Sequence, residues 1–89
     1  MIDNAVTGWV IEAYYEDAET LAWEVPLLVA RKEDLERDLR MSLQTPDVYP
    51  ITPRQVIAAV RVFASDVSPD QLDLDPRRLS FFLAAVARG

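Results

Sequence analysis

The sequence predicts an α+β domain: an N-terminal antiparallel β-hairpin followed by three α-helices that pack on one of its faces. Residues 9–28 contain two aromatic and β-branched segments with alternating hydrophobicity, as is typical of half-buried strands. After residue 30, apolar residues recur at helical spacing behind proline-containing helix starts. The 89 residues are 51 % hydrophobic and contain no linker or repeat, so we expect a single domain over 1–89.

The predicted hairpin joins residues 9–16 to residues 20–28 through the three-residue turn Asp17-Ala18-Glu19. Pairing Glu16 with Thr20 sets the register and gives one apolar face, made of Trp9, Ile11, Ala13, Tyr15, Leu21, Trp23, Val25 and Leu27. On the other face, which is half acidic, Glu12 lies directly opposite Glu24. A lone hairpin is only marginally stable in water, so later elements must cover its apolar face.

Three helices are predicted to provide this cover, and the first spans residues 31–44. Its apolar stripe and its i,i+4 ion pairs are formed by Leu35, Leu39 and Leu43 and by Glu33–Arg37 and Glu36–Arg40. The second helix begins at Thr52-Pro53-Arg54-Gln55, where Thr52 is the N-cap and Gln55 closes a capping box. It runs to about Ala64, and residues 49–51 before it form an extended connector.

The third helix is predicted to start at Asp75-Pro76, after a similar start at Ser68-Pro69 that leaves room for little more than one turn. Its packed stripe consists of Leu79, Phe82, Leu83 and Val86. Phe81 lies beside this stripe, and we expect it to belong to the core with Trp9, Trp23, Phe63 and Phe82. If so small a core cannot cover all five, Phe81 is the one expected to be exposed and to mark an oligomer contact. The sequence leaves open whether a third short strand, from residues 1–6 or 47–51, completes the sheet.

The composition argues against an enzyme. Without cysteine or histidine, the chain cannot form a disulfide, a thiolate or imidazole metal site, or a Ser-His triad. Acidic side chains can bind Ca²⁺ or act as catalytic pairs, but there is no DxDxDG-type loop, and an open hairpin face provides no cleft. We therefore predict a non-enzymatic protein with no metal and no cofactor.

The net charge of −6 is concentrated in the first third of the chain. Residues 1–30 contain six acidic and no basic residues, whereas residues 31–89 contain nine of each. This charge repels nucleic-acid phosphates and anionic lipids and attracts basic surfaces. No apolar run approaches the ~18 residues that span a bilayer, and the N-terminus lacks a signal-peptide pattern. We expect a cytoplasmic protein with a basic protein partner, without direct contact to nucleic acid or membrane.

Four arginines suggest an alternative, a helix-turn-helix surface that reads nucleic acid: Arg54, Arg61, Arg77 and Arg78. The segment between their helices carries four aspartates, which would lie unfavourably near phosphates. Arg77 and Arg78 are instead expected to pair with those aspartates.

The candidate partner-binding residues cluster on the acidic face of the hairpin and at its turn: Glu12, Tyr14, Glu16, Asp17, Glu19 and Glu24. Like charges opposite one another on paired strands are unfavourable, and a local rule broken at a surface indicates a binding site. Tyr14 among these carboxylates would supply contact area for a basic partner. The alternative is that these charges, with Pro26, only prevent edge-to-edge aggregation.

Four segments resemble those of a group of small bacterial proteins: Trp9-Val-Ile-Glu-Ala-Tyr-Tyr-Glu-Asp, Leu21-Ala-Trp-Glu-Val-Pro-Leu, Tyr49-Pro-Ile-Thr-Pro-Arg-Gln and Leu79-Ser-Phe-Phe-Leu. The group is similar to immunity proteins that are encoded beside polymorphic toxins, so the resemblance implies binding and inhibition of a toxin domain. It implies no catalytic residue. This chain departs from the group by extra acidic residues between positions 66 and 75.

These observations lead to one hypothesis and two alternatives. The leading hypothesis is a non-enzymatic immunity or inhibitor protein whose acidic hairpin neutralises a basic toxin or effector domain. The first alternative is a structural or scaffold subunit that forms a homodimer or larger homo-oligomer through a strand edge or through Phe81. The second is a phosphate-mimicking inhibitor of a nucleic-acid enzyme.

Overall fold

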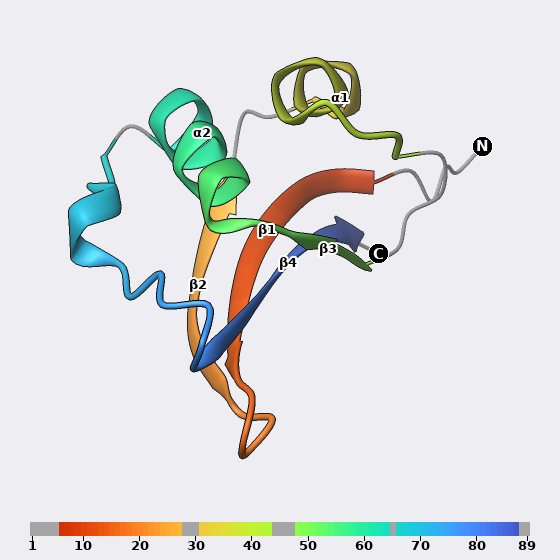
Figure 1. Ribbon diagram of the computed structural model, residues 1–89. Coiled ribbons are helices and arrows are strands. Elements are labelled where there is room, and N and C mark those ends of the chain that lie inside the picture. The colour runs from red at the N-terminus through yellow and green to blue at the C-terminus, as the bar shows by residue number, and fades with distance from the viewer. Residues whose placement is uncertain (1–5, 28–30, 44–47, 65, 88–89) are drawn as a thin grey trace.

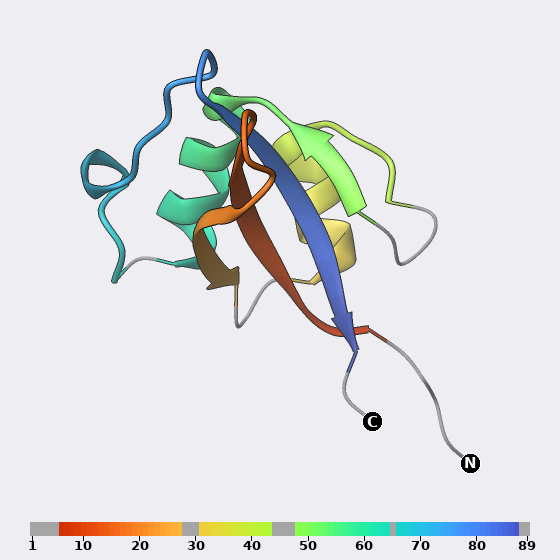
Figure 2. The same ribbon diagram turned by 90° about the horizontal axis from the view of Figure 1, so that it is seen from below.

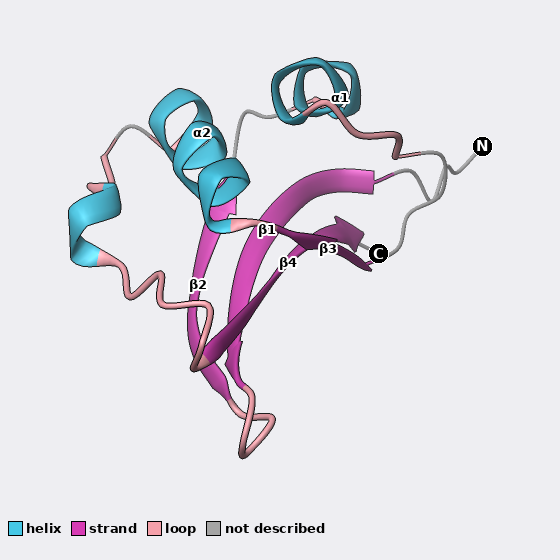
Figure 3. Cartoon of the chain, viewed as in Figure 1, coloured by secondary structure: helices cyan, strands magenta, loops and turns pink. Residues whose placement is uncertain are grey.

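The computed structural model describes residues 6–27, 31–43, 48–64 and 66–87, which form a four-stranded antiparallel sheet with two α-helices (Figures 1 and 3). The elements in chain order are β1 (Val6–Tyr15), β2 (Leu21–Leu27), α1 (Lys32–Leu39), β3 (Val48–Ile51), α2 (Pro53–Phe63), the 3₁₀ turn η1 (Pro69–Gln71) and β4 (Leu79–Ala87). The strand order is β2-β1-β4-β3. The predicted α+β class is confirmed, whereas the arrangement of three helices on a hairpin is wrong.

Strands β1 and β2 form the predicted hairpin, and its register is confirmed along most of its length. Trp9 pairs with Leu27, and Glu12 pairs with Glu24. Side chains on alternate positions of both strands therefore reach opposite faces of the sheet as the sequence indicates.

The hairpin turn is one residue longer than predicted. The N–H of Tyr15 donates to the carbonyl of Thr20 at 2.9 Å, so four residues connect the strands instead of three. A β-bulge at Ala22 absorbs the extra residue and restores the predicted register beyond it. The bulge also pairs Leu21 with Tyr14, which moves Leu21 from the predicted apolar face to the opposite one, where it is 47 % exposed.

Residues 79–87 form strand β4, so the predicted third helix is wrong. Phe81 belongs to the core and is not the exposed aromatic residue that the sequence offered as an oligomer contact. This side chain is only 4 % exposed, because β4 lies between two strands and pairs Phe81 with Ala13 of β1 and Ile51 of β3. The Asp75-Pro76 helix start survives as a single turn, in which the N–H of Leu79 donates to the Asp75 carbonyl at 3.0 Å. The chain then leaves the helical path to join the sheet.

The short third strand that the sequence left open is β3, within residues 47–51, and the predicted connector 49–51 belongs to it. It pairs with β4 rather than with the hairpin. The other candidate for a third strand was the segment 1–6. Residues 1–5 lie outside the described residues, and Val6 is the first residue of β1.

Helices α1 and α2 confirm two of the predicted helices. The N-terminus of α2 has the predicted capping box, with both Thr52–Gln55 hydrogen bonds present at 2.9 and 3.2 Å. Helix α1 is shorter than predicted because it ends at Leu39. The next residue, Arg40, adopts a left-handed φ of 54°, and the N–H of Met41 donates to the Glu36 carbonyl. Arg37 pairs with Asp34 and Asp38 instead of Glu33.

The hydrophobic core lies between the helices and one face of the sheet. Its fully buried large side chains come from all of these layers: Ile11, Leu27, Leu35, Leu43, Leu79, Leu83, Val56 and Val60. Seen from below, both helices lie behind the strands, and the near face of the sheet has no helix on it (Figure 2). Within the described ranges, neither helix has the length and apolarity needed to cross a membrane.

Candidate functional site

The helix-free face of the sheet, which we call the open face, carries the residues that alternate with the core positions. They are Gly8, Val10, Glu12 and Tyr14 of β1, Leu21, Glu24 and Pro26 of β2, Val48 and Pro50 of β3, and Ser80, Phe82, Ala84 and Val86 of β4. Val48, Leu21 and Val86 are 51, 47 and 40 % exposed. A Cβ atom built on Gly8 would meet no atom within 4 Å, as expected of an uncovered surface.

Most of the open face is apolar. One row across all four strands consists of Pro26, Val10, Ala84 and Val48. The next row consists of Glu24, Glu12, Phe82 and Pro50, so its acidic half lies on the hairpin and its apolar half on β4 and β3. In the first row Pro26 and Val48 are exposed at the two edges, whereas Val10 and Ala84 between them are only 8 and 7 % exposed. Exposed apolar side chains gathered on one face of a small domain indicate a contact site.

The binding site predicted from the sequence does not include the apolar half of this surface. The sequence predicts Phe82 and Val86 in the packed stripe of a helix, and Pro50 in a connector. The signal that reveals them is the period-two pattern of residues 79–87, in which the other alternate positions, Phe81 and Leu83, are buried.

The carboxylates of Glu12 and Glu24 oppose each other on the open face, as the sequence predicts. Glu12 is half-buried and Glu24 is exposed. Burial raises the pKa of the nearby Tyr14 phenol, and the charges of Glu12 and Glu24 and a hydrogen bond to Glu12 raise it further. The phenol therefore stays protonated through the neutral pH range and remains a neutral donor beside the two acids.

Replacing Glu24 by lysine turns this repulsive cross-strand pair into an attractive one. We expect Glu24→Lys to raise the free energy of unfolding by about 0.5 kcal/mol at low salt, and this gain to shrink in 1 M NaCl because both groups face solvent. Urea denaturation at the two salt concentrations measures the effect. The double variant Glu12→Lys/Glu24→Lys restores a like-charge pair and should return close to wild type. A loss of stability in Glu24→Lys would contradict the opposition of the two carboxylates.

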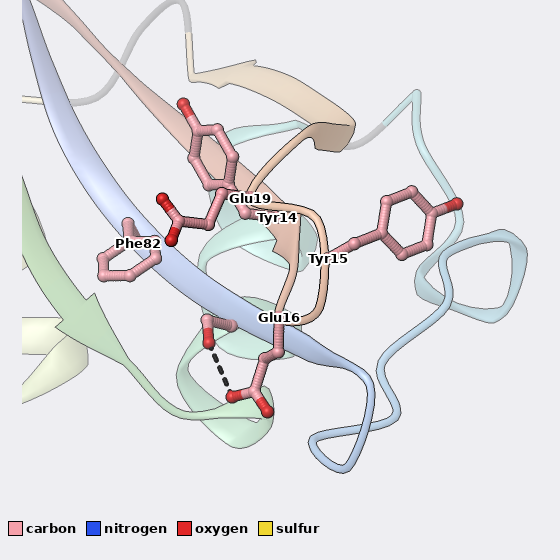
Figure 4. Close-up of a pocket in the computed structure, with 6 residues that line it drawn as sticks. Tyr14, Tyr15, Glu16, Glu19 and Phe82 are labelled. Carbon is pink, nitrogen blue, oxygen red and sulfur yellow. Dashed lines mark hydrogen bonds between the residues drawn. The ribbon is translucent and has the colours of Figure 1, made fainter.

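At the end of the hairpin, a hollow of about 600 Å³ adjoins the open face (Figure 4). Its lining residues are Tyr14, Tyr15, Glu16, Glu19, Ser80 and Phe82, and we call it the hairpin hollow. The rings of Tyr14 and Phe82 meet edge to face, with centroids 6.0 Å apart and an interplanar angle of 67°. Tyr15 also lines the hollow, and its ring points away from Tyr14.

Three hydrogen bonds position the two acidic residues of the hairpin hollow. Glu16 accepts a hydrogen bond from the Ser80 hydroxyl at 2.9 Å, and its N–H donates to the Arg78 carbonyl at 3.0 Å. Glu19 adopts a left-handed φ of 53°, and its N–H donates to the Tyr15 carbonyl at 2.7 Å. The turn therefore fixes the backbone of both residues, and the Ser80 hydroxyl also holds the Glu16 carboxylate.

The structure divides the predicted partner-binding residues into three places. Tyr14, Glu16 and Glu19 share the hairpin hollow, while Glu12 and Glu24 lie in the adjoining row of the open face. Asp17 is separated from them: it lines a second hollow of about 520 Å³, together with Tyr15, Glu16, Arg77 and Arg78. Asp17 is therefore not among the residues that line the hairpin hollow or the open face.

The predicted pairing of Arg77 and Arg78 with aspartates is confirmed. Arg77 binds Asp75 at 3.2 Å, and Arg78 contacts both Asp73 and Asp75. Hydrogen bonds from the side chain and backbone of Arg77 lower the pKa of the Asp75 carboxyl. The other two arginines of the alternative nucleic-acid surface, Arg54 and Arg61, belong to α2.

In the described part of the chain, no three acidic side chains gather closely enough to hold a metal ion. Comparison of the chain with protein-family models, with curated proteins and with solved structures finds no match. What the site can do chemically therefore follows from its geometry: it presents aromatic and aliphatic surface next to carboxylates, in a shape that is open to a macromolecule.

Proposed function

We propose that this protein is a non-enzymatic binding protein whose open face receives a basic protein partner, and that it inhibits a toxin or effector domain in this way. The observation that carries the proposal is the open face itself. A helix-free sheet surface combines exposed apolar side chains with the opposed carboxylates of Glu12 and Glu24. The inhibitory role is proposed from the resemblance to immunity proteins.

The two halves of the open face suit different parts of an association. Burial of Phe82, Val48 and their apolar neighbours would supply the affinity. The acidic hairpin would accelerate encounter with a basic surface and orient it. The carboxylate opposition, which is unfavourable in the free protein, would be relieved by a cation placed between Glu12 and Glu24.

Contact through the face is favoured over addition of a strand to the sheet. Both edge strands carry a proline, Pro26 in β2 and Pro50 in β3, and β3 has only four residues. Self-association is also disfavoured, because two open faces packed together would each present the Glu12–Glu24 pair. Phe81, the other predicted route to a homo-oligomer, is buried.

The test is capture of a partner with the tagged full chain from a lysate of its source organism, followed by measurement of Kd with the purified partner. We expect a basic protein, with binding that weakens as salt increases. The variant Glu12→Lys/Glu24→Lys should weaken binding by at least about tenfold. Co-expression of the wild-type chain should suppress the toxicity of the partner in cells, and the double variant should not.

A matched control has the same change of charge outside the open face. Asp66 and Asp70 are exposed and lie between α2 and β4, with Asp70 in the 3₁₀ turn η1. Asp66→Lys/Asp70→Lys should therefore change Kd by less than about twofold. Equal losses of affinity in the two double variants would show that net charge alone weakens binding, and would overturn the assignment of the partner-binding site to the open face. Unchanged affinity in Glu12→Lys/Glu24→Lys would overturn it as well.

A further inference from the structure

The hairpin hollow differs from the rest of the open face because it combines aromatic rings, carboxylates and concave shape. Tyr14 and Phe82 form one wall, with ring centroids 6.0 Å apart. Glu16 and Glu19 reach it from the turn, and Figure 4 shows the carboxylate of Glu19 on the same side as the two rings. The hollow has a volume of about 600 Å³ and is open to solvent, so a side chain of a partner can reach it.

The chemistry of these walls selects a cation that also has a flat surface. An aromatic face attracts a cation that lies over it, and a planar guanidinium can stack on the ring while it donates hydrogen bonds to carboxylates. Glu16 uses Oε2 to accept from Ser80, which leaves Oε1 for a second donor. A small metal ion requires several oxygen ligands, and no group of three acidic side chains among the described residues could hold one.

We propose that the hairpin hollow is the binding site for an arginine side chain of the partner, with the guanidinium against Tyr14 and Phe82 and its N–H groups donating to Glu16 and Glu19. This proposal rests on the proposed function, since it names the residue of the basic partner that the protein recognises. The Glu12–Glu24 row then supports recognition through its charge, next to a specific pocket at the hairpin end.

A chemical-shift titration of the ¹⁵N-labelled full chain with N-acetyl-arginine amide tests the site without the partner. The expected Kd is on the order of 1 mM, as for one exposed cation–aromatic contact with charge assistance. The amide signals of Tyr14, Glu16, Glu19, Ser80 and Phe82 should shift together. N-acetyl-citrulline amide, which has nearly the same shape without the charge, should bind at least about tenfold more weakly.

Two results of this titration would overturn the proposal. One is equal binding of the arginine and citrulline compounds, which would show that charge is not recognised. The other is that the shifts appear equally at Asp66 and Asp70, which would show only weak attraction to exposed acids. A smaller response to N-acetyl-lysine amide would support recognition of the planar guanidinium, and an equal response would overturn the preference for arginine.

Variants separate the contribution of each wall. Phe82→Leu keeps an apolar side chain and removes the ring, so it should weaken arginine binding several-fold. Glu19 and Arg40 both adopt a left-handed backbone, with φ values of 53° and 54°, and glycine relieves the strain of this conformation. Glu19→Gly also removes a carboxylate from the hollow, whereas Arg40→Gly changes a residue outside it. Both glycine variants should melt at higher temperature than wild type, but only Glu19→Gly should lose arginine affinity. Retained affinity in both Phe82→Leu and Glu19→Gly would overturn the proposal.

The failure of this site can be told apart from the failure of the proposed function. If arginine amide does not bind the hollow but partner affinity depends on Glu12 and Glu24, the arginine assignment is wrong and the binding role stands. If arginine amide binds and partner affinity is insensitive to Glu12 and Glu24, the hollow stands and the open face as the interface is wrong.

Discussion

Replacing Phe81 by alanine is expected to destabilise the protein by about 3–5 kcal/mol, which is a large part of the stability of a domain of this size. Phe81 is 4 % exposed and packs against Trp23, with ring centroids 6.0 Å apart. Its removal leaves a cavity between the sheet and the helices that neighbouring side chains can fill only in part. Urea denaturation followed by circular dichroism measures the change.

The adjacent aromatic residue provides the matched control. Phe82 lies on the open face and is half-buried, so Phe82→Ala should cost only about 1 kcal/mol. This ranking distinguishes the strand from the helix that the sequence also permits, because the helix would bury Phe82 and expose Phe81. A larger loss of stability in Phe82→Ala than in Phe81→Ala would contradict strand β4.

The ambiguity of residues 79–87 explains why the sequence did not predict this strand. Its hydrophobic residues satisfy both periods: Leu79, Phe82, Leu83 and Val86 have helical spacing, while Leu79, Phe81, Leu83 and Ala85 alternate. Local start signals at Asp75-Pro76 favour the helix. The strand wins because β4 can pair with β1 on one side and β3 on the other, and such distant pairings are invisible to a local pattern.

The hairpin, in contrast, was predictable because its strands are neighbours in sequence and their register depends on the alternation of apolar residues. The requirement to bury Trp9, Ile11 and Val25 on one side is strong enough to restore the register after a longer turn, through the bulge at Ala22. The exact length of the turn carries no comparable constraint, since its residues are exposed.

The candidate site, like the fold, was predictable only in part. Its acidic half depends on the hairpin register, so the opposition of Glu12 and Glu24 followed from the sequence. Its apolar half requires β4 and β3 beside the hairpin, and the hairpin hollow requires Phe82 and Ser80 next to Tyr14 and Glu16. Phe82 and Ser80 are more than 60 positions from Tyr14 and Glu16 in the sequence, and only the assembled sheet brings them together.

Trp23 connects the edge strand of the sheet to the loop that supports the hairpin hollow. Its indole Nε1–H donates to the Asp73 carbonyl at 3.0 Å, and its ring packs against Phe81. Trp23→Leu should therefore cost about 2–3 kcal/mol, through lost ring contact and an unpaired carbonyl. Trp23→Phe keeps most of the apolar contact and should cost about 1–2 kcal/mol, mostly for the hydrogen bond. Urea denaturation ranks the two variants.

The substitution Trp23→Phe should also affect the candidate site, because the loop that Trp23 contacts leads to the residues that hold Glu16. Arg78, which is anchored to Asp73 and Asp75, offers its carbonyl to the Glu16 N–H, and Ser80 then holds the Glu16 carboxylate. If Trp23 anchors this segment, Trp23→Phe should accelerate hydrogen exchange of the amides of residues 72–79 and of Glu16. Trp9→Phe, a change of the same kind in the buried core, should lower global stability without this local effect. Equal exchange at these amides in both variants would mean that the ion pairs alone hold the loop, and that the hairpin hollow is independent of Trp23.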